Sequence, residues 1–140
     1  MAQYLFNLVK ADGHAVRELA AGFLRVSMWG IGADEPHAHA LASGDQILLY
    51  LGAPERVFIG RADLASAAHD WTPSEAQACP GDSTRGVLLA QVEEWDPPVS
   101  MGTVLSRMAP SEKARADFQT GVVRITANEY KTALAVATER

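Results

Sequence analysis

Cysteine is almost absent from this sequence, and so are long apolar runs. The one cysteine, Cys79, has no second cysteine with which to form an internal disulfide or a metal-binding pair. No apolar run approaches the roughly 18 to 20 residues that cross a bilayer, and the N-terminus lacks the basic and apolar segments of a secretory signal. We therefore expect a soluble, cytoplasmic protein that does not associate with membranes.

Basic residues are also scarce. The chain has 12 Lys and Arg against 17 Asp and Glu, which gives a formal net charge of −5. Non-specific nucleic-acid binding depends mainly on phosphate neutralisation by Lys and Arg, so this charge argues against a surface that binds any nucleic acid. If the protein binds nucleic acid, its affinity must come from a pocket combined with a local basic patch.

Recognisable catalytic motifs are missing as well. There is no P-loop, the serines lack the flanking glycines of a nucleophile elbow, and Gly30-Ile31-Gly32 lacks the third glycine of a dinucleotide-binding turn. His37 and His39 point to different sides of a helix, and Glu93-Glu94 point to opposite faces of a strand. We therefore predict a protein that is not an enzyme and that carries no cofactor and no metal ion.

What is present predicts one α+β domain over residues 1–140. Hydrophobic residues make up 48% of the chain and charged residues 21%, as in ordinary globular proteins. Apolar periodicity and turn residues predict six strands and several short helices, with Gly60 at a bulge or a barrel bend and Asp96-Pro97-Pro98 ending a strand. The expected strands are residues 3–9, 25–29, 47–52, 56–64, 86–95 and 121–125, and the expected helices start near residues 12, 36, 72, 101 and 126.

Two tryptophans stand where a large ring is difficult to bury. Trp29 ends a predicted strand beside Gly30, and Trp71 follows a predicted loop, residues 66–70. If the loop folds over the glycine corner, the two indoles could form a stacking cage for a planar base. The alternative is that each tryptophan is a core or lid residue, and Trp95 is expected to pack a strand end against a helix.

The order of these segments resembles the EVE family of the PUA-like superfamily, which is related to YTH domains. The resemblance covers nearly the whole chain and is carried by residues 4–7, 28–31, 44–50, 58–62 and 96–99. It implies a small mixed β-barrel surrounded by short helices. It also implies a pocket that accepts a modified base flipped out of DNA or exposed in RNA.

The resemblance implies functional positions residue by residue. Trp29 is similar to the pocket-wall tryptophan, and Trp71 to the second cage aromatic. The resemblance also implies pocket roles for Asn7, Tyr50 and, in an alternative register of the first strand, Lys10. Gly30, at the corner beside Trp29, and Met28, which could line an apolar recess for a methyl group, complete the predicted pocket. Candidate phosphate contacts are Lys10, Arg25, Arg56, Arg61 and Arg85.

The sequence thus predicts a non-catalytic reader of a modified base, with modified cytosine such as 5-methylcytosine in DNA as the first candidate. The family's frequent partnership with nucleases suggests a nuclease as a partner protein. Two alternatives remain open: an RNA-binding module that reads a modified ribonucleotide, and a small-molecule-binding protein or hydrolase that uses the same cavity. After Trp29 the family often has a longer polar and aromatic run, so the identity of the base stays open.

Overall fold

The computed structural model describes residues 1–8, 16–32, 35, 37–52, 55–108 and 121–139. The predicted base contact Lys10 lies outside these residues. The strands are β1 (Gln3–Leu8), β2 (Met28–Gly30), β3 (Gln46–Leu51), β4 (Val57–Leu64), β5 (His69–Asp70), β6 (Arg85–Ser100) and β7 (Val122–Ile125). The helices are α1 (Val16–Val26), the 3-10 helix η1 (Ala38–Ala40), α2 (Pro73–Ala78), α3 (Met101–Leu105) and α5 (Ala127–Glu139).

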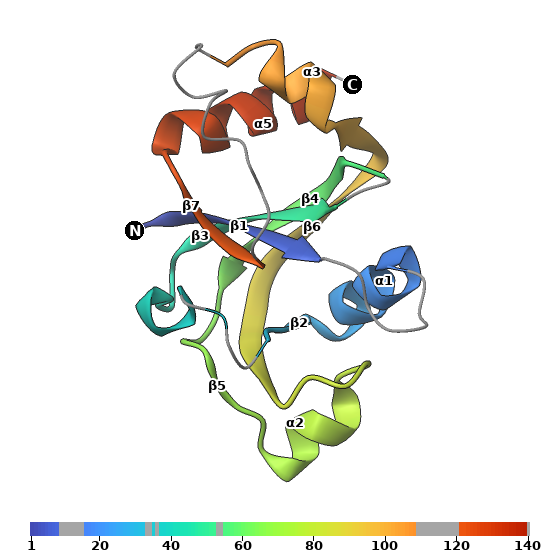
Figure 1. Ribbon diagram of the computed structural model, residues 1–140, viewed down its shortest axis with the longest axis vertical. Coiled ribbons are helices and arrows are strands. Elements are labelled where there is room, and N and C mark those ends of the chain that lie inside the picture. The colour runs from blue at the N-terminus through green and yellow to red at the C-terminus, as the bar shows by residue number, and fades with distance from the viewer. Residues whose placement is uncertain (9–15, 33–34, 36, 53–54, 109–120, 140) are drawn as a thin grey trace.

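The strands form one mixed sheet that curls into a half-barrel, which confirms the predicted α+β fold. The strand order is β2-β6-β4-β3-β1-β7, and β5 pairs with β6 beside this path. β1 and β3 run parallel, while the other pairs are antiparallel. In Figure 1, α3 and α5 lie together on one side of the sheet, α1 lies on the other, and α2 lies at the far end near β5.

Two hydrophobic clusters lie on the two faces of the sheet. Successive side chains of a strand point to opposite faces, and β1 shows this directly, because Phe6 belongs to the first cluster and Leu5 to the second. The first cluster joins α1 to the curled sheet and includes Trp29. The second packs the sheet against α3 and α5 and includes Trp95.

The predicted strand at residues 25–29 is wrong at its start. Helix α1 continues to Val26, Ser27 has a positive φ of 54°, and the strand runs only from Met28 to Gly30. The helical apolar spacing, which buries Ala20 and Phe23, extends the helix further than the alternation suggested. Arg25 therefore stands in the last turn of a helix, where its charge complements the helix dipole.

The predicted stop at Asp96-Pro97-Pro98 is also wrong. β6 continues through these residues to Ser100. The prolines are tolerated because they fall in an irregularity of the ladder between β4 and β6: Gly60 pairs with Glu94 and Phe58 pairs with Val99, so residues 95–98 lie between these two pairs, outside the regular register. No ladder hydrogen bond is required from a proline there. The same irregularity confirms the bulge predicted at Gly60.

Both predicted capping boxes are present. Thr72 and Glu75 exchange side-chain and backbone hydrogen bonds at the start of α2, and Thr126 and Glu129 do so at the start of α5. The predicted loop before Trp71 contains the short strand β5, which pairs with β6. Within the described residues, no helix is long and apolar enough to cross a membrane.

Candidate functional site

A cavity of about 210 Å³ lies where the two ends of the curled sheet approach each other. β2 is the last strand at one end of the sheet, and β7, next to β1, is the last at the other. Residues from both ends line the cavity, so it occupies the seam of the half-barrel. Its lining residues define what we call the Trp29 cavity: Asn7, Leu8, Trp29, Gly30, Ile31, Gly32, Glu35, Gly121 and Val122.

Trp29 is held rigidly at this seam. Its ring packs against Phe6 at 6.2 Å and against Phe23 at 5.1 Å between centroids, and the residue is only 2% exposed. Its backbone pairs with Val87 of β6. Trp29 is therefore both a core residue and part of the cavity wall, so the two predicted roles of this tryptophan are combined.

Glu35 was not predicted as a site residue, yet it lines the cavity. Its backbone N–H donates to the carbonyl of Gly32 (3.2 Å) and its carbonyl accepts from Ala38 (3.3 Å), so these two bonds fix the position of its backbone. Oε2 accepts a hydrogen bond from the backbone of Gly121 at 3.1 Å. Oε1 is buried and has no hydrogen-bond partner among the described residues. The only sequence signal was a carboxylate three residues beyond the Gly30-Ile31-Gly32 corner.

Trp71 does not line the Trp29 cavity. Its ring packs over Gly86 of β6, where a Cβ would collide with both the Trp71 ring and the carbonyl oxygen of Trp29. Its Nε1 lies 3.4 Å from Ser83 Oγ, and its ring meets His69 edge-on at 5.5 Å. The Trp71 ring therefore packs near the backbone of Trp29, and only Trp29 of the two predicted cage residues lines this cavity.

The other predicted pocket residues are divided between the two faces of the sheet. Gly30 lines the Trp29 cavity, and Met28 is buried in the first hydrophobic cluster. Tyr50 belongs to the second cluster, so it does not support the cavity from below. Asn7 is at the cavity, but alternation along β1 places its side chain on the face of Tyr50, and a Cβ at Gly52 would lie 3.0 Å from its Oδ1.

Of the predicted phosphate contacts, Arg85 is bonded through its backbone to a residue of the cavity wall. Its carbonyl accepts a hydrogen bond of 3.0 Å from Ile31, which lines the cavity, and its Nε is buried without a partner among the described residues. Arg61 is already engaged by Tyr130, the carbonyl of Gln91 and Asp63. Arg56 is exposed, and its carbonyl accepts a hydrogen bond from the backbone of Met101, where β4 begins and β6 ends.

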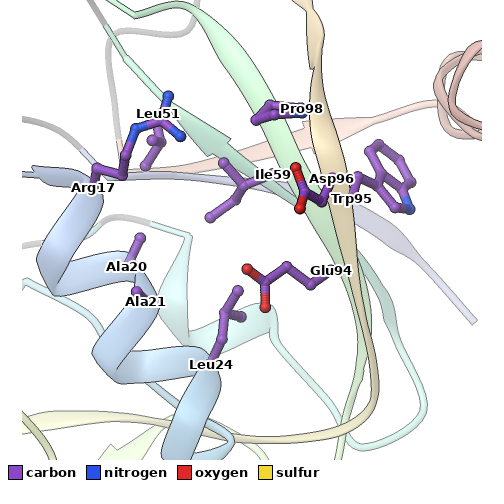
Figure 2. Close-up of a pocket in the computed structure, with 10 residues that line it drawn as sticks. All are labelled: Arg17, Ala20, Ala21, Leu24, Leu51, Ile59, Glu94, Trp95, Asp96 and Pro98. Atoms are coloured by element: carbon purple, nitrogen blue, oxygen red, sulfur yellow. The ribbon is translucent and has the colours of Figure 1, made fainter. Parts of the chain in front are cut away.

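A second cavity, of about 200 Å³, lies between α1 and β6 (Figure 2). We call it the α1–β6 cavity. The carboxylates of Glu94 and Asp96 flank it on the β6 side, while Trp95 turns its ring away from α1. Its lining residues are Arg17, Ala20, Ala21, Leu24, Leu51, Ile59, Glu94, Trp95, Asp96 and Pro98.

Neither cavity has the side chains of a metal centre. No group of three or more His, Cys, Asp or Glu residues placed to hold a metal ion occurs in the described part of the chain. Cys79 is buried, and burial raises the pKa of its thiol.

The comparisons with known proteins identify the fold. No protein-family model and no curated protein matches the sequence. Human THYN1, solved in complex with DNA containing 5-methylcytosine, has a TM-score of 0.64 and 12% identity, over 100% of this chain and 99% of THYN1. An ASCH protein from Zymomonas mobilis has a TM-score of 0.59 and 14% identity, over 96% and 95%. Rpa0253 from Rhodopseudomonas palustris has a TM-score of 0.63 and 17% identity, over 99% and 94%. The chain therefore has the PUA-like fold that the resemblance implied.

Proposed function

We propose that this PUA-like domain is a non-catalytic nucleic-acid-binding module that accepts one modified base, 5-methylcytosine in DNA, in the Trp29 cavity. The observation that supports this most is the cavity itself, a space of about 210 Å³ beside an indole at the seam of the sheet. Pockets for drug-sized ligands begin at roughly 300 Å³, so this volume suits a single flat heterocycle. Human THYN1, which shares the fold, was solved with DNA carrying this base.

The apolar part of the wall gives a physical reason to prefer a methylated base. Leu8, Ile31 and Val122 line the cavity together with Trp29. Burying one methyl group there contributes about 0.8 kcal/mol, or roughly a fourfold gain in affinity. The methyl group alone therefore gives modest discrimination.

The cost of extracting the base determines which DNA binds best. Flipping a base out of a duplex costs a few kcal/mol, and less when the base is mismatched or unpaired. The cavity has one indole rather than two, so stacking offsets only part of this cost. We expect single-stranded or mismatched sites to bind more tightly than a fully paired duplex.

The charge distribution adds a second requirement. A net charge of −5 is unfavourable for the approach of an anionic strand. The backbone of Arg85 is bonded to the cavity-lining Ile31, and we propose that the Arg85 guanidinium contacts a phosphate of the bound strand. We propose that binding is local to this part of the molecule, that it takes place in the cytoplasm, and that a nuclease partner acts on the bound DNA.

A competition titration at one stated salt concentration tests the proposal. A labelled single-stranded oligonucleotide with one 5-methylcytosine is displaced by unlabelled competitors of the same sequence: methylated DNA, unmethylated DNA, and methylated RNA. We expect methylated DNA to compete about four times better than unmethylated DNA and better than RNA. Equal competition by methylated and unmethylated DNA would overturn the modified-base assignment.

The same experiment separates the alternative functions. Tighter binding of the RNA would overturn the choice of DNA in favour of an RNA-binding module. If no oligonucleotide binds while mass spectrometry finds a metabolite retained by the purified protein, the cavity serves a small molecule. Recovery of the oligonucleotide with unchanged mass after incubation is expected for a non-catalytic module, and cleavage or base loss would contradict that part.

A further inference from the structure

Resting on the proposed function, we propose that Glu35 makes the Trp29 cavity selective for a base with an exocyclic amino group, so that 5-methylcytosine is accepted and thymine is rejected. Sequence patterns did not indicate this residue. The inference depends on the position of one buried oxygen atom and on the chemistry of the two bases.

The carboxylate of Glu35 is fixed in place with one oxygen left over. Oε2 accepts from the backbone N–H of Gly121 at 3.1 Å, which ties Glu35 to the residue just before β7. Oε1 is buried, has no partner among the described residues, and belongs to a residue that lines the cavity. A buried acceptor without a donor is unfavourable, so a ligand that brings an N–H group to Oε1 gains a hydrogen bond that the empty cavity lacks.

The bases 5-methylcytosine and thymine differ in the atom that such an acceptor would meet. Both carry a methyl group at C5, so the apolar wall cannot distinguish them. Cytosine presents the N4 amino group as a donor, whereas thymine presents O4 as an acceptor, and an ionised carboxylate can only accept. Where Oε1 of Glu35 meets position 4 of the ring, it would therefore attract the first base and repel the second, whose N–H donor lies at position 3 instead.

The expected selectivity follows from the strength of one hydrogen bond to a charged group. Such a bond contributes about 1.5 to 3 kcal/mol, which corresponds to roughly a 10- to 150-fold preference for 5-methylcytosine over thymine. A deaminated 5-methylcytosine is a thymine, so this preference would let the protein distinguish the mark from its deamination product.

The test compares two oligonucleotides that differ only in 5-methylcytosine or thymine at the central position. The unaltered protein should prefer 5-methylcytosine by at least about tenfold. In Glu35→Gln, the amide oxygen can keep the bond to Gly121 and turn the amide nitrogen, a donor, toward the ligand, so the preference should fall to near one or reverse. Glu35→Asp keeps a carboxylate and should bind more weakly without reversing the preference.

Glu94→Gln is the matched control, because it removes the same charge from the wall of the α1–β6 cavity (Figure 2). Its preference should equal that of the unaltered protein, and thermal unfolding should show all variants folded. An unchanged preference in Glu35→Gln would overturn this inference while leaving the proposed function standing. Failure of the unaltered protein to bind 5-methylcytosine would instead overturn the proposed function.

Discussion

The two cavities are nearly equal in volume, about 210 and 200 Å³, and both are lined by a tryptophan that is 2% exposed. They differ in their position in the sheet and in the charged residues around them, which both affect the binding of a base on an anionic strand. The Trp29 cavity lies at the seam of the sheet, with one carboxylate and with Arg85 nearby. The α1–β6 cavity is flanked by two carboxylates, Glu94 and Asp96, and the arginine that lines it, Arg17, is ion-paired with Glu55. Volume and an aromatic residue are thus insufficient to identify a nucleic-acid site.

The difference originates in the sheet. At the seam, the sheet ends bring glycines and an aromatic residue together, and Glu35 is held by its bond to Gly121. At the other cavity, the irregular ladder at residues 95–98 turns Trp95 into the second hydrophobic cluster and leaves Glu94 and Asp96 exposed. Phosphate groups would meet like charge there. We therefore expect substitutions at the Trp29 cavity to lower the affinity for DNA, and matched substitutions at the α1–β6 cavity to leave it unchanged.

The largest expected effect on affinity is that of replacing the indole of Trp29. Trp29→Phe should lower affinity for the methylated oligonucleotide by about tenfold, because stacking on an aromatic contributes about 1 to 3 kcal/mol and a smaller ring retains only part of it. Trp95→Phe, an equally buried indole beside the other cavity, should leave affinity unchanged. Fluorescence anisotropy titrations of both variants measure the difference.

Phenylalanine is preferred to alanine at these positions because truncating a buried tryptophan to alanine costs about 3 to 5 kcal/mol, a large part of the stability of a domain. Thermal unfolding of the two variants should show similar losses of stability. An equal loss of affinity in both would mean that stability, rather than the Trp29 cavity, sets binding.

The next effect concerns charge. Arg85→Gln should weaken binding about threefold regardless of methylation and should reduce the slope of log K against log salt concentration by about one, as expected when one phosphate contact is lost. Arg56→Gln, which removes the same charge elsewhere on the sheet, should change neither. Titrations at four salt concentrations test this, and identical slopes for both variants would remove Arg85 from the interface.

The smallest effect is a pH dependence of stability that arises where β5 meets α2. We call this region, with His69, Trp71 and Glu75, the β5–α2 flank. Hydrogen bonds to the carbonyl of Ala67 and to Glu75 raise the pKa of His69. The resulting stabilisation is complete below the ordinary histidine pKa of about 6.5 and is lost as the pH rises through the raised value. The Glu75 pKa is lowered, first by the hydrogen bond from Thr72 and then by His69, so its contribution is present throughout this range.

The melting temperature should therefore fall by about 1 °C more between pH 5.5 and 8.5 in the unaltered protein than in His69→Asn, because a partly exposed pair contributes little. Affinity for the oligonucleotide should show no such difference between the two proteins. A difference in affinity would place the β5–α2 flank, including Trp71, at the binding site and would weaken the contrast between the two cavities.

The sequence was sufficient for most of the fold because local signals and tertiary structure agree. Capping boxes at Thr72 and Thr126, the bulge at Gly60 and the apolar strands all appear where pattern and turn chemistry place them. The secondary structure predicted from the sequence was wrong at residues 25–27 and 96–98. In the first case the helix extends into a segment that also alternates, and in the second a ladder irregularity tolerates prolines that a regular strand would exclude.

The site was less predictable because it is assembled from distant segments. Trp29 and Gly30 were recognised from a corner in one segment. Glu35 acquires its role only through Gly121, which is 86 residues away in sequence. Tyr50 was misplaced because the face of a strand depends on which of the two hydrophobic clusters it joins, and alternation alone does not distinguish them.

The most direct test of the central claim is to add an apolar side chain at each cavity in turn. Gly32 is an exposed residue that lines the Trp29 cavity, and a Cβ there would meet no described atom within 4 Å, so Gly32→Leu should fold normally and add an apolar side chain at the edge of this cavity. Ala21→Leu is the matched substitution, because Ala21 is an exposed residue that lines the α1–β6 cavity. With both variants shown to be folded, we predict that Gly32→Leu loses at least about tenfold in affinity for the methylated oligonucleotide, whereas Ala21→Leu binds like the unaltered protein. Undiminished binding by Gly32→Leu would contradict the account.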